Sequence, residues 1–174
     1  YLACKDAVDI KKKGSAYTIK LENLFNGSRS DYSPALLGEE GENLYFTTNR
    51  PSVTGNDLSG VTGLKNGDIF YAKKDEKGIW KRPEALDANV NTEDDEGTPA
   101  FSPDGKTMFL TICRKDPQYP RMAEIWKSQR TDATWSKPEQ VKLTADTLSN
   151  YAHPAISPDG GWLYFVSDMP GGFG

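Results

Sequence analysis

The sequence is poor in the residues that most often carry metal ions or nucleophilic chemistry. It contains one histidine, His153, and two cysteines, Cys4 and Cys113, among 174 residues. The cysteine spacing fits no metal-binding pattern, and one histidine does not make a metal cage. Cys113 lies in the apolar run TMFLTIC, so we expect it to pack as a small hydrophobic residue. A disulfide between the two cysteines is the less favoured alternative.

Long apolar runs and an excess of positive charge are also missing. No run reaches the roughly 18 apolar residues of a membrane-spanning helix, so we expect no membrane insertion by this segment. The formal net charge is −4, and the one lysine run, residues 11–13, reads as a solvated helix end. These features argue against a nucleic-acid partner.

Turn-forming and aromatic residues are plentiful. The chain has 16 glycines and 11 prolines, and aromatic residues make up 11% of it. Frequent turns combined with aromatic residues favour an all-β protein built from short strands.

Three segments repeat the same order of a proline, a glycine-containing turn and an aromatic strand. Their prolines, Pro34, Pro99 and Pro154, are separated by 65 and 55 residues. A second block occurs twice, with Trp80 and Trp135 each leading a W-x-x-P element. The repeated sequences are DYSPALLGEEGENLYFTTNR (31–50), GTPAFSPDGKTMFLTICRK (97–115) and AHPAISPDGGWLYFVSDMP (152–170), followed in the second block by GDIFYAKKDEKGIWKRPEAL (67–86) and AEIWKSQRTDATWSKPEQVKL (123–143).

Four-stranded units that repeat at this spacing are typical of a β-propeller. We predict two complete blades, residues 31–86 and 98–143, and a half blade, residues 153–167, within a propeller region of residues 15–174. The expected strands are 32–37, 43–49, 68–73 and 79–86, then 98–102, 107–113, 124–129 and 134–143, and finally 153–157 and 162–167. Because two and a half blades cannot close a ring, we read the chain as part of a larger object.

The first residues do not belong to the repeat. Apolar residues at helical spacing and Gly14 predict that residues 1–14 form a short helix, the end of a preceding helical region. Leu21, at the end of residues 17–21, precedes Pro34 by 13 residues, and Leu86 precedes Pro99 by the same 13 residues. We therefore predict that residues 17–21 are a fourth strand that closes the ring by pairing with the last blade.

Two features invite a chemical interpretation. His153 precedes Pro154 where Ser33 and Thr98 precede their prolines, so we favour a structural role over a catalytic one. The run Glu93 to Glu96 holds four successive carboxylates, which suggests Ca²⁺ binding. Its spacing is not that of an EF-hand loop, so we favour a solvated acidic loop.

The long polar loops are the favoured binding region. In a propeller, loops 50–67, 87–97 and 144–152 lie on one rim, and binding usually resides in such loops. The alternative for their aromatic and arginine residues is packing between blades. The candidate protein-binding residues are Asn56, Asp57, Tyr119, Arg121 and Tyr151.

The motifs SPDG before an aromatic strand, D-I-aromatic and W-x-x-P resemble the WD40-like, TolB-type propeller repeat. YAHPAISPDGGWLYFVSDMPGGFG and SDYSPALL with LYFTTNR resemble envelope proteins of Bacteroidota, which carry a tetratricopeptide region, this propeller and an OmpA-type domain. The family includes the PorE type, a lipoprotein component of type IX secretion. The resemblance implies a periplasmic location at the outer membrane and protein partners in the cell envelope. Peptidoglycan binding would belong to the OmpA-type domain, which these residues lack.

No nucleophile, metal set or paired-carboxylate motif accompanies the repeats, so we expect no cofactor and no catalysis. The favoured function is a non-catalytic propeller scaffold that binds proteins. The alternative is a propeller that accompanies a peptidase or glycan hydrolase, because fold alone does not decide function.

Overall fold

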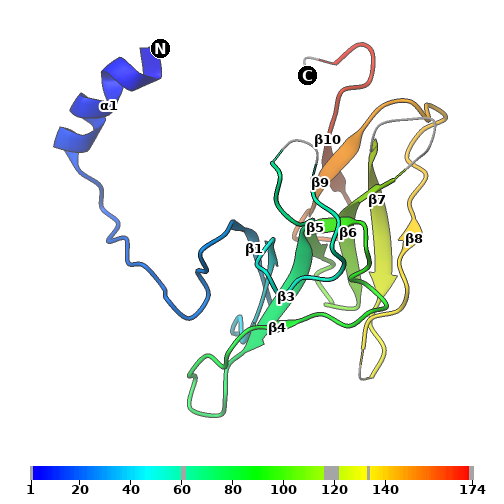
Figure 1. Cartoon of the computed structure of the whole chain (residues 1–174), viewed down its shortest axis with the longest axis horizontal. Coiled ribbons are helices and arrows are strands. Elements are labelled where there is room, and N and C mark those ends of the chain that lie inside the picture. Colours follow the sequence, from blue (N-terminus) through cyan, green and yellow to red (C-terminus); the bar gives the residue numbers. More distant parts are fainter. Residues whose placement is uncertain (1, 60–61, 116–121, 133, 173–174) are drawn as a thin grey trace.

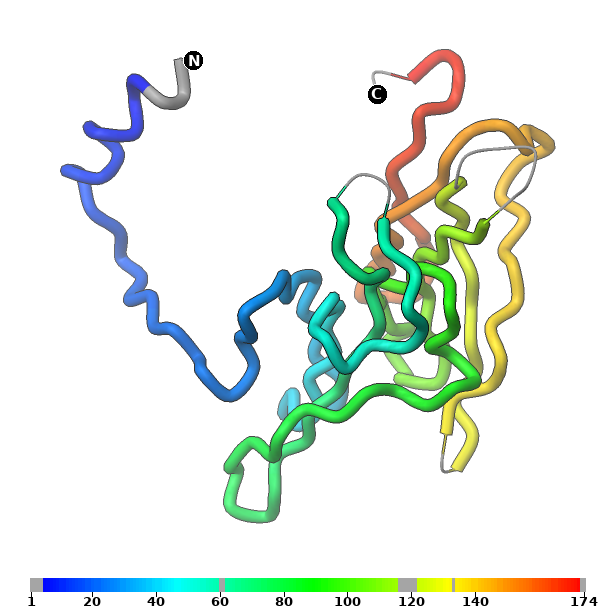
Figure 2. The backbone as a smooth tube through the Cα atoms, in the orientation of Figure 1, coloured from blue at the N-terminus to red at the C-terminus, as the bar shows by residue number. Residues whose placement is uncertain are grey.

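The protein is described by a computed structural model over residues 2–59, 62–115, 122–132 and 134–172 (Figures 1 and 2). These residues form mostly β-structure with one short helix, which confirms the all-β prediction. The elements are α1 (Leu2–Lys13), β1 (Asp31–Leu37), β2 (Asn43–Thr48), β3 (Asp68–Lys73), β4 (Glu84–Ala85), β5 (Asp95–Phe101), β6 (Thr107–Arg114), β7 (Met122–Gln129), β8 (Glu139–Gln140), β9 (Tyr151–Ile156) and β10 (Leu163–Ser167).

The strands form three antiparallel sheets in which chain neighbours pair with each other. The first sheet has the order β1-β2-β3-β4, the second β5-β6-β7-β8, and the third contains β9 and β10. Each predicted strand of the three units corresponds to one observed strand. The fourth strands, β4 and β8, are only two residues long, because Pro83 and Pro138 just before them have no N–H to donate to a longer ladder.

The first strand of every sheet contains an unusual backbone position immediately before its proline. Ser33, Thr98 and His153 have φ of 50°, 51° and 54°, the left-handed region that residues other than glycine seldom adopt. In all three sheets the pairing register shifts at this point. The repeated left-handed residue turns its N–H out of its own sheet.

The main core lies between the first and second sheets. Ile69, Met108 and Leu110 are fully buried there, and each contributes about 1.5–3 kcal/mol through removal of its side chain from water. Tyr45 packs against Phe101 with ring centroids 4.7 Å apart. The two repeats thus stabilise each other through facing apolar surfaces.

The opposite face of the first sheet is covered by chain from outside the repeat. Phe25 packs edge-on against Phe46, with ring centroids 6.3 Å apart. Arg50 lies over the Phe46 and Phe70 rings, at 5.3 and 4.8 Å, and donates to Asp31 Oδ1 at 2.7 Å. This stacked arginine fastens the segment before β1 to the sheet.

The sheet of β9 and β10 has an exposed apolar surface. Its strand β9 contacts β5, β6 and β7 of the second sheet. Trp162, just before β10, is 67% exposed, and Tyr164 and Val166 on β10 are 60% and 53% exposed. The third sheet therefore presents an apolar face that no described residue covers.

Residues 17–21 form no strand in this structure, and their pairing with a last blade stays a prediction. Tyr17, Ile19 and Leu21 are 84%, 92% and 73% exposed, and the segment has no regular structure. A strand needs the backbone of a neighbour, and none of the described residues pairs with this one. The helix α1 is present as expected, but it lies apart from the sheets at the end of an extended segment (Figures 1 and 2).

Candidate functional site: the loop edge

Three loops gather along one edge of the sheets. Asn66 Nδ2 of the first loop donates to Glu93 O of the second at 2.9 Å. Leu148 of the third loop lines a hollow together with Asp94 of the second. The loops therefore lie on one side of the protein, as expected, and we call this surface the loop edge: residues 50–67, 87–94 and 144–150.

The first loop is anchored at its base by a buried carboxylate. Asp68 Oδ2 accepts a hydrogen bond from the Thr54 N–H at 2.7 Å, while Asp68 Oδ1 is buried and accepts none from the described residues. Burial is the main cause that raises the pKa of Asp68. Leu58 and Lys65 form an antiparallel bridge higher in the loop. These contacts anchor the described part of the loop.

The structure separates the predicted contact residues of the loop edge. Asn56 is exposed, and Asp57 forms an ion pair with Lys115, with the two side chains 48% and 55% exposed. Asp57 therefore links the first unit to the second. Tyr119 and Arg121 lie outside the described residues.

Tyr151, the remaining predicted contact, is a packing residue. It is 8% exposed, and its ring lies 5.8 Å from Phe165, edge-on. Its hydroxyl shares a hydrogen bond of 2.7 Å with Thr144 Oγ1. Tyr151 thus packs within the third sheet and against the loop before it, and it also lines a cavity beside residues 140–149. Its predicted role as a protein contact stays a prediction.

The acidic run is not a solvated loop, which corrects the favoured interpretation. Glu93 is exposed, but Glu96 is fully buried as the second residue of β5. Thr92 donates to both of its carboxylate oxygens through its N–H and its hydroxyl. Burial, with smaller contributions from the charges of Asp68 and Asp94, raises the pKa of Glu96 to about 7. Glu96 lies inside because the buried part of β5 begins at this residue and continues through Pro99.

Carboxylates with raised pKa values often mark functional sites. Glu96 is fully buried but borders a cavity of about 390 Å³, which Arg114 and Trp126 also line. Its carboxylate is occupied by the two hydrogen bonds from Thr92, so we assign it a structural role. Among the described residues, no group of three or more histidine, cysteine, aspartate or glutamate side chains is placed to hold a metal ion. No helix in the described ranges is long and apolar enough to cross a bilayer.

His153 acts through its backbone. Its N–H donates to Thr111 Oγ1 in the second sheet at 3.0 Å. In the same way, the N–H of Thr98 donates to Thr47 Oγ1 in the first sheet at 2.9 Å. The position before each proline therefore joins one sheet to the preceding one, whatever side chain it carries. The disulfide between Cys4 and Cys113, the less favoured alternative, involves the side chain of Cys4. That side chain lies outside the part of the chain that the structure describes.

Two residues that sequence analysis missed hold the structure together. Arg50 fixes the segment before β1, and Asn91, 2% exposed, inserts its side chain between β3 and the residue after β4. The run FTTNR gives no sign that its arginine stacks on two phenylalanines. The position of Asn91 in the repeat could have drawn attention to it. It follows Leu86 by five residues, and Asp146 occupies the equivalent position of the second unit.

No protein-family model matches the chain, and no curated protein matches its sequence.

Proposed function

We propose that these sheets belong to a β-propeller that acts as a non-catalytic scaffold and binds protein partners in the periplasm at the outer membrane. The first two sheets share one strand order, and each packs face to face on the next. Closure of such units into a ring would cover the apolar face of β10. The location and the place in type IX secretion rest on the resemblance of the repeats to those of Bacteroidota envelope proteins.

One observation carries the scaffold function. The groups that most resemble catalytic ones serve the contacts between repeats: His153 donates to Thr111 through its backbone, and the buried Glu96 is held by Thr92. By contrast, the loop edge presents exposed residues such as Asn56 on a fixed base. Rigid scaffolds that carry exposed loops are a common design for protein binding.

The substitution His153→Ala tests the scaffold against an enzymatic function. The variant keeps the backbone N–H, so its melting temperature should stay close to that of the unchanged protein. On a panel of peptide and glycan substrates, we expect neither protein to hydrolyse any of them. Hydrolysis by the unchanged protein that disappears in a stably folded His153→Ala variant would contradict the proposal.

A further inference from the structure

In the first unit, an asparagine side chain completes the hydrogen bonds between β3 and the residue after β4. Asn91 Oδ1 accepts from the Ile69 N–H at 2.9 Å, and Asn91 Nδ2 donates to Ile69 O at 2.9 Å and to Leu86 O at 3.0 Å. Leu86 N in turn donates to Ile69 O at 2.9 Å. The carboxamide thus supplies both a donor and an acceptor to backbone groups that would otherwise be unpaired in the interior.

The residue before Asn91 fills the space next to the carboxamide. Val90 has no exposed surface and belongs to the main core. A turn places both residues, since the N–H groups of Val90 and Asn91 donate to Asp87 O at 3.0 and 3.1 Å. In the first unit, the space beside Ile69 and Leu86 is therefore filled by a small aliphatic residue, Val90, and the asparagine that follows it.

The second unit has the same backbone arrangement. Val141 N donates to Ile125 O at 2.8 Å, as Leu86 does to Ile69. On β7, the N–H of Ala123 points away from β6, because it donates to Asn150 Oδ1 at 2.9 Å. Alternation along the strand directs the Ile125 N–H to the same side. Among the described residues, the Ile125 N–H makes no return hydrogen bond to Val141 O.

The side chain that corresponds to Asn91 does not bridge these groups. It is Asp146, whose carboxylate accepts instead from Leu148 N at 2.8 Å and from the Ser149 hydroxyl. These bonds lower the pKa of Asp146, so it is an anion with acceptors only. A carboxylate could not donate to Val141 O as an amide does. The counterpart of Val90 is Ala145, which is exposed.

A cavity of about 460 Å³ lies at this position, between β7 and residues 140–149. Ile125, Val141, Leu143 and Tyr151 are among the residues that line it. Its charged lining consists of Glu124, Asp146 and Lys142, so charges of both signs border the cavity. Apolar walls beside a fixed set of backbone polar groups are typical of binding pockets.

We propose that this cavity binds a segment of a partner protein that presents a small aliphatic residue followed by an asparagine. The asparagine carboxamide would accept from the Ile125 N–H and donate to Val141 O, and the aliphatic side chain would lie against Leu143 and Tyr151. This inference specifies the chemistry of the partner and rests on the proposed protein-binding function. The first unit contains its own version of that ligand in Val90 and Asn91.

The test is a titration of the ¹⁵N-labelled chain with the peptide acetyl-Ala-Asn-Val-Asn-Thr-amide, which copies residues 88–92. The Ile125 amide resonance should move progressively downfield as it gains an acceptor. The matched peptide with Val-Asp in place of Val-Asn should bind about tenfold more weakly, because it loses the donor to Val141 O. Equal binding of the two peptides, or no movement of Ile125, would overturn the proposal.

Two variants place the peptide in this cavity. Asp146→Asn should bridge Ile125 and Val141 by itself, slow hydrogen exchange at Ile125 and abolish the titration. Ala145→Leu should lower the affinity for the peptide, because the larger side chain fills the space that the peptide valine would occupy. It replaces Asp146→Asn as the test variant if that protein does not fold. The control Asp132→Asn makes the same chemical change at an exposed site elsewhere and should bind normally. Peptide binding unaffected by either cavity variant would contradict the assignment.

The peptide titration and the search for envelope partners can fail independently of each other. The titration uses purified protein and needs no cell envelope. Binding of the Val-Asn peptide without any envelope partner would preserve this site and remove the proposed scaffold role. Envelope partners without peptide binding would leave the scaffold role and remove this site.

Discussion

The backbone N–H of His153 donates a 3.0 Å hydrogen bond to the hydroxyl of Thr111, 42 residues earlier in the chain. Thr98 makes the equivalent bond to Thr47 at 2.9 Å. Both donors are left-handed residues before a proline, and both acceptors lie on the second strand of the preceding sheet. Each pair ties one repeat to the next through a left-handed residue. The proline that follows does not itself favour this conformation, because it biases the preceding residue toward extended backbone.

Replacing the acceptor should therefore weaken the contact between sheets. Thr111→Val leaves the part-buried N–H of His153 without this partner and also removes the buried Thr98 Oγ1 contact, seen at 2.7 Å. We expect a loss of about 1–3 kcal/mol in the free energy of unfolding, measured by urea denaturation. Thr111→Ser keeps the hydroxyl and should lose less. A Thr111→Val variant as stable as Thr111→Ser would contradict this link.

The buried Glu96 predicts that stability falls as pH rises through neutrality. Its pKa is about 7 in the folded protein, against an ordinary value of 4.5, so the folded state holds the proton more tightly between these values. The free energy of unfolding should fall from about pH 4.5 to pH 7, by up to about 3 kcal/mol for this group. The raised pKa of Asp68 acts in the same direction.

Glu96→Gln separates this effect from the titration of other groups. The amide keeps hydrogen-bonding capacity toward Thr92 but does not ionise, so the fall between pH 4.5 and 7 should become much smaller. Stability curves at closely spaced pH values provide the measurement. A fall of the same size in both proteins would show that Glu96 is not its source.

Arg50 should be one of the most sensitive surface-facing residues. Its guanidinium bonds Asp31 and Thr48 and lies over two phenylalanine rings, and its side chain is only 18% exposed. Arg50→Ala leaves Asp31 without its partner, and we expect a loss of about 3 kcal/mol. Arg50→Lys keeps the charge but not the planar fork, so it should recover only part of the loss. Full recovery by lysine, in thermal melts of the three proteins, would contradict the stacking account.

The ion pair at the loop edge should contribute little to stability. Asp57 and Lys115 are about half exposed, and pairs of this kind contribute about 0.2–1 kcal/mol. Asp57→Ala should therefore leave the melting temperature nearly unchanged. A large drop would mean that the pair holds loop 50–67 in place, and the variant could then not serve to test binding.

The repeats made most of the strand pattern predictable. The spacing of Pro34, Pro99 and Pro154 located the three units, and strands β1 to β3 lie within one or two residues of their expected positions. The length of β4 was overestimated, because residues 79–83 follow the edge of β3 through an isolated bridge at Trp80 and do not form a continuous ladder.

The features that sequence did not reveal depend on contacts between units. Residues 17–21 have the alternation of a strand, but a strand also requires a partner that the pattern does not supply. Glu96 lies in an acidic run, and only the register of β5 with β6 places it inside. Asn91 and Asp146 differ by one atom type, yet the first completes a ladder and the second borders a cavity. Such roles follow from geometry that composition does not encode.

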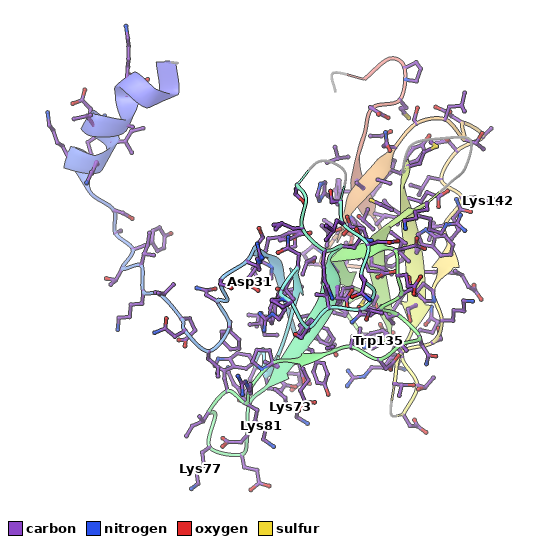
Figure 3. All side chains as sticks on the ribbon, in the orientation of Figure 1. Asp31, Lys73, Lys77, Lys81, Trp135 and Lys142 are labelled. Carbon is purple, nitrogen blue, oxygen red and sulfur yellow. The ribbon has the colours of Figure 1, made fainter. Side chains whose placement is uncertain are left out.

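Site-specific photocrosslinking in cell envelopes of the organism that makes the protein tests the scaffold role most directly. The crosslinker would replace Asn56, exposed on the loop edge, and in a matched control Lys77, at the tip of the loop between β3 and β4 (Figure 3). We predict a discrete protein adduct from position 56 that the Lys77 position does not give. No adduct at either position, or the same adducts at both, would contradict a protein-binding loop edge.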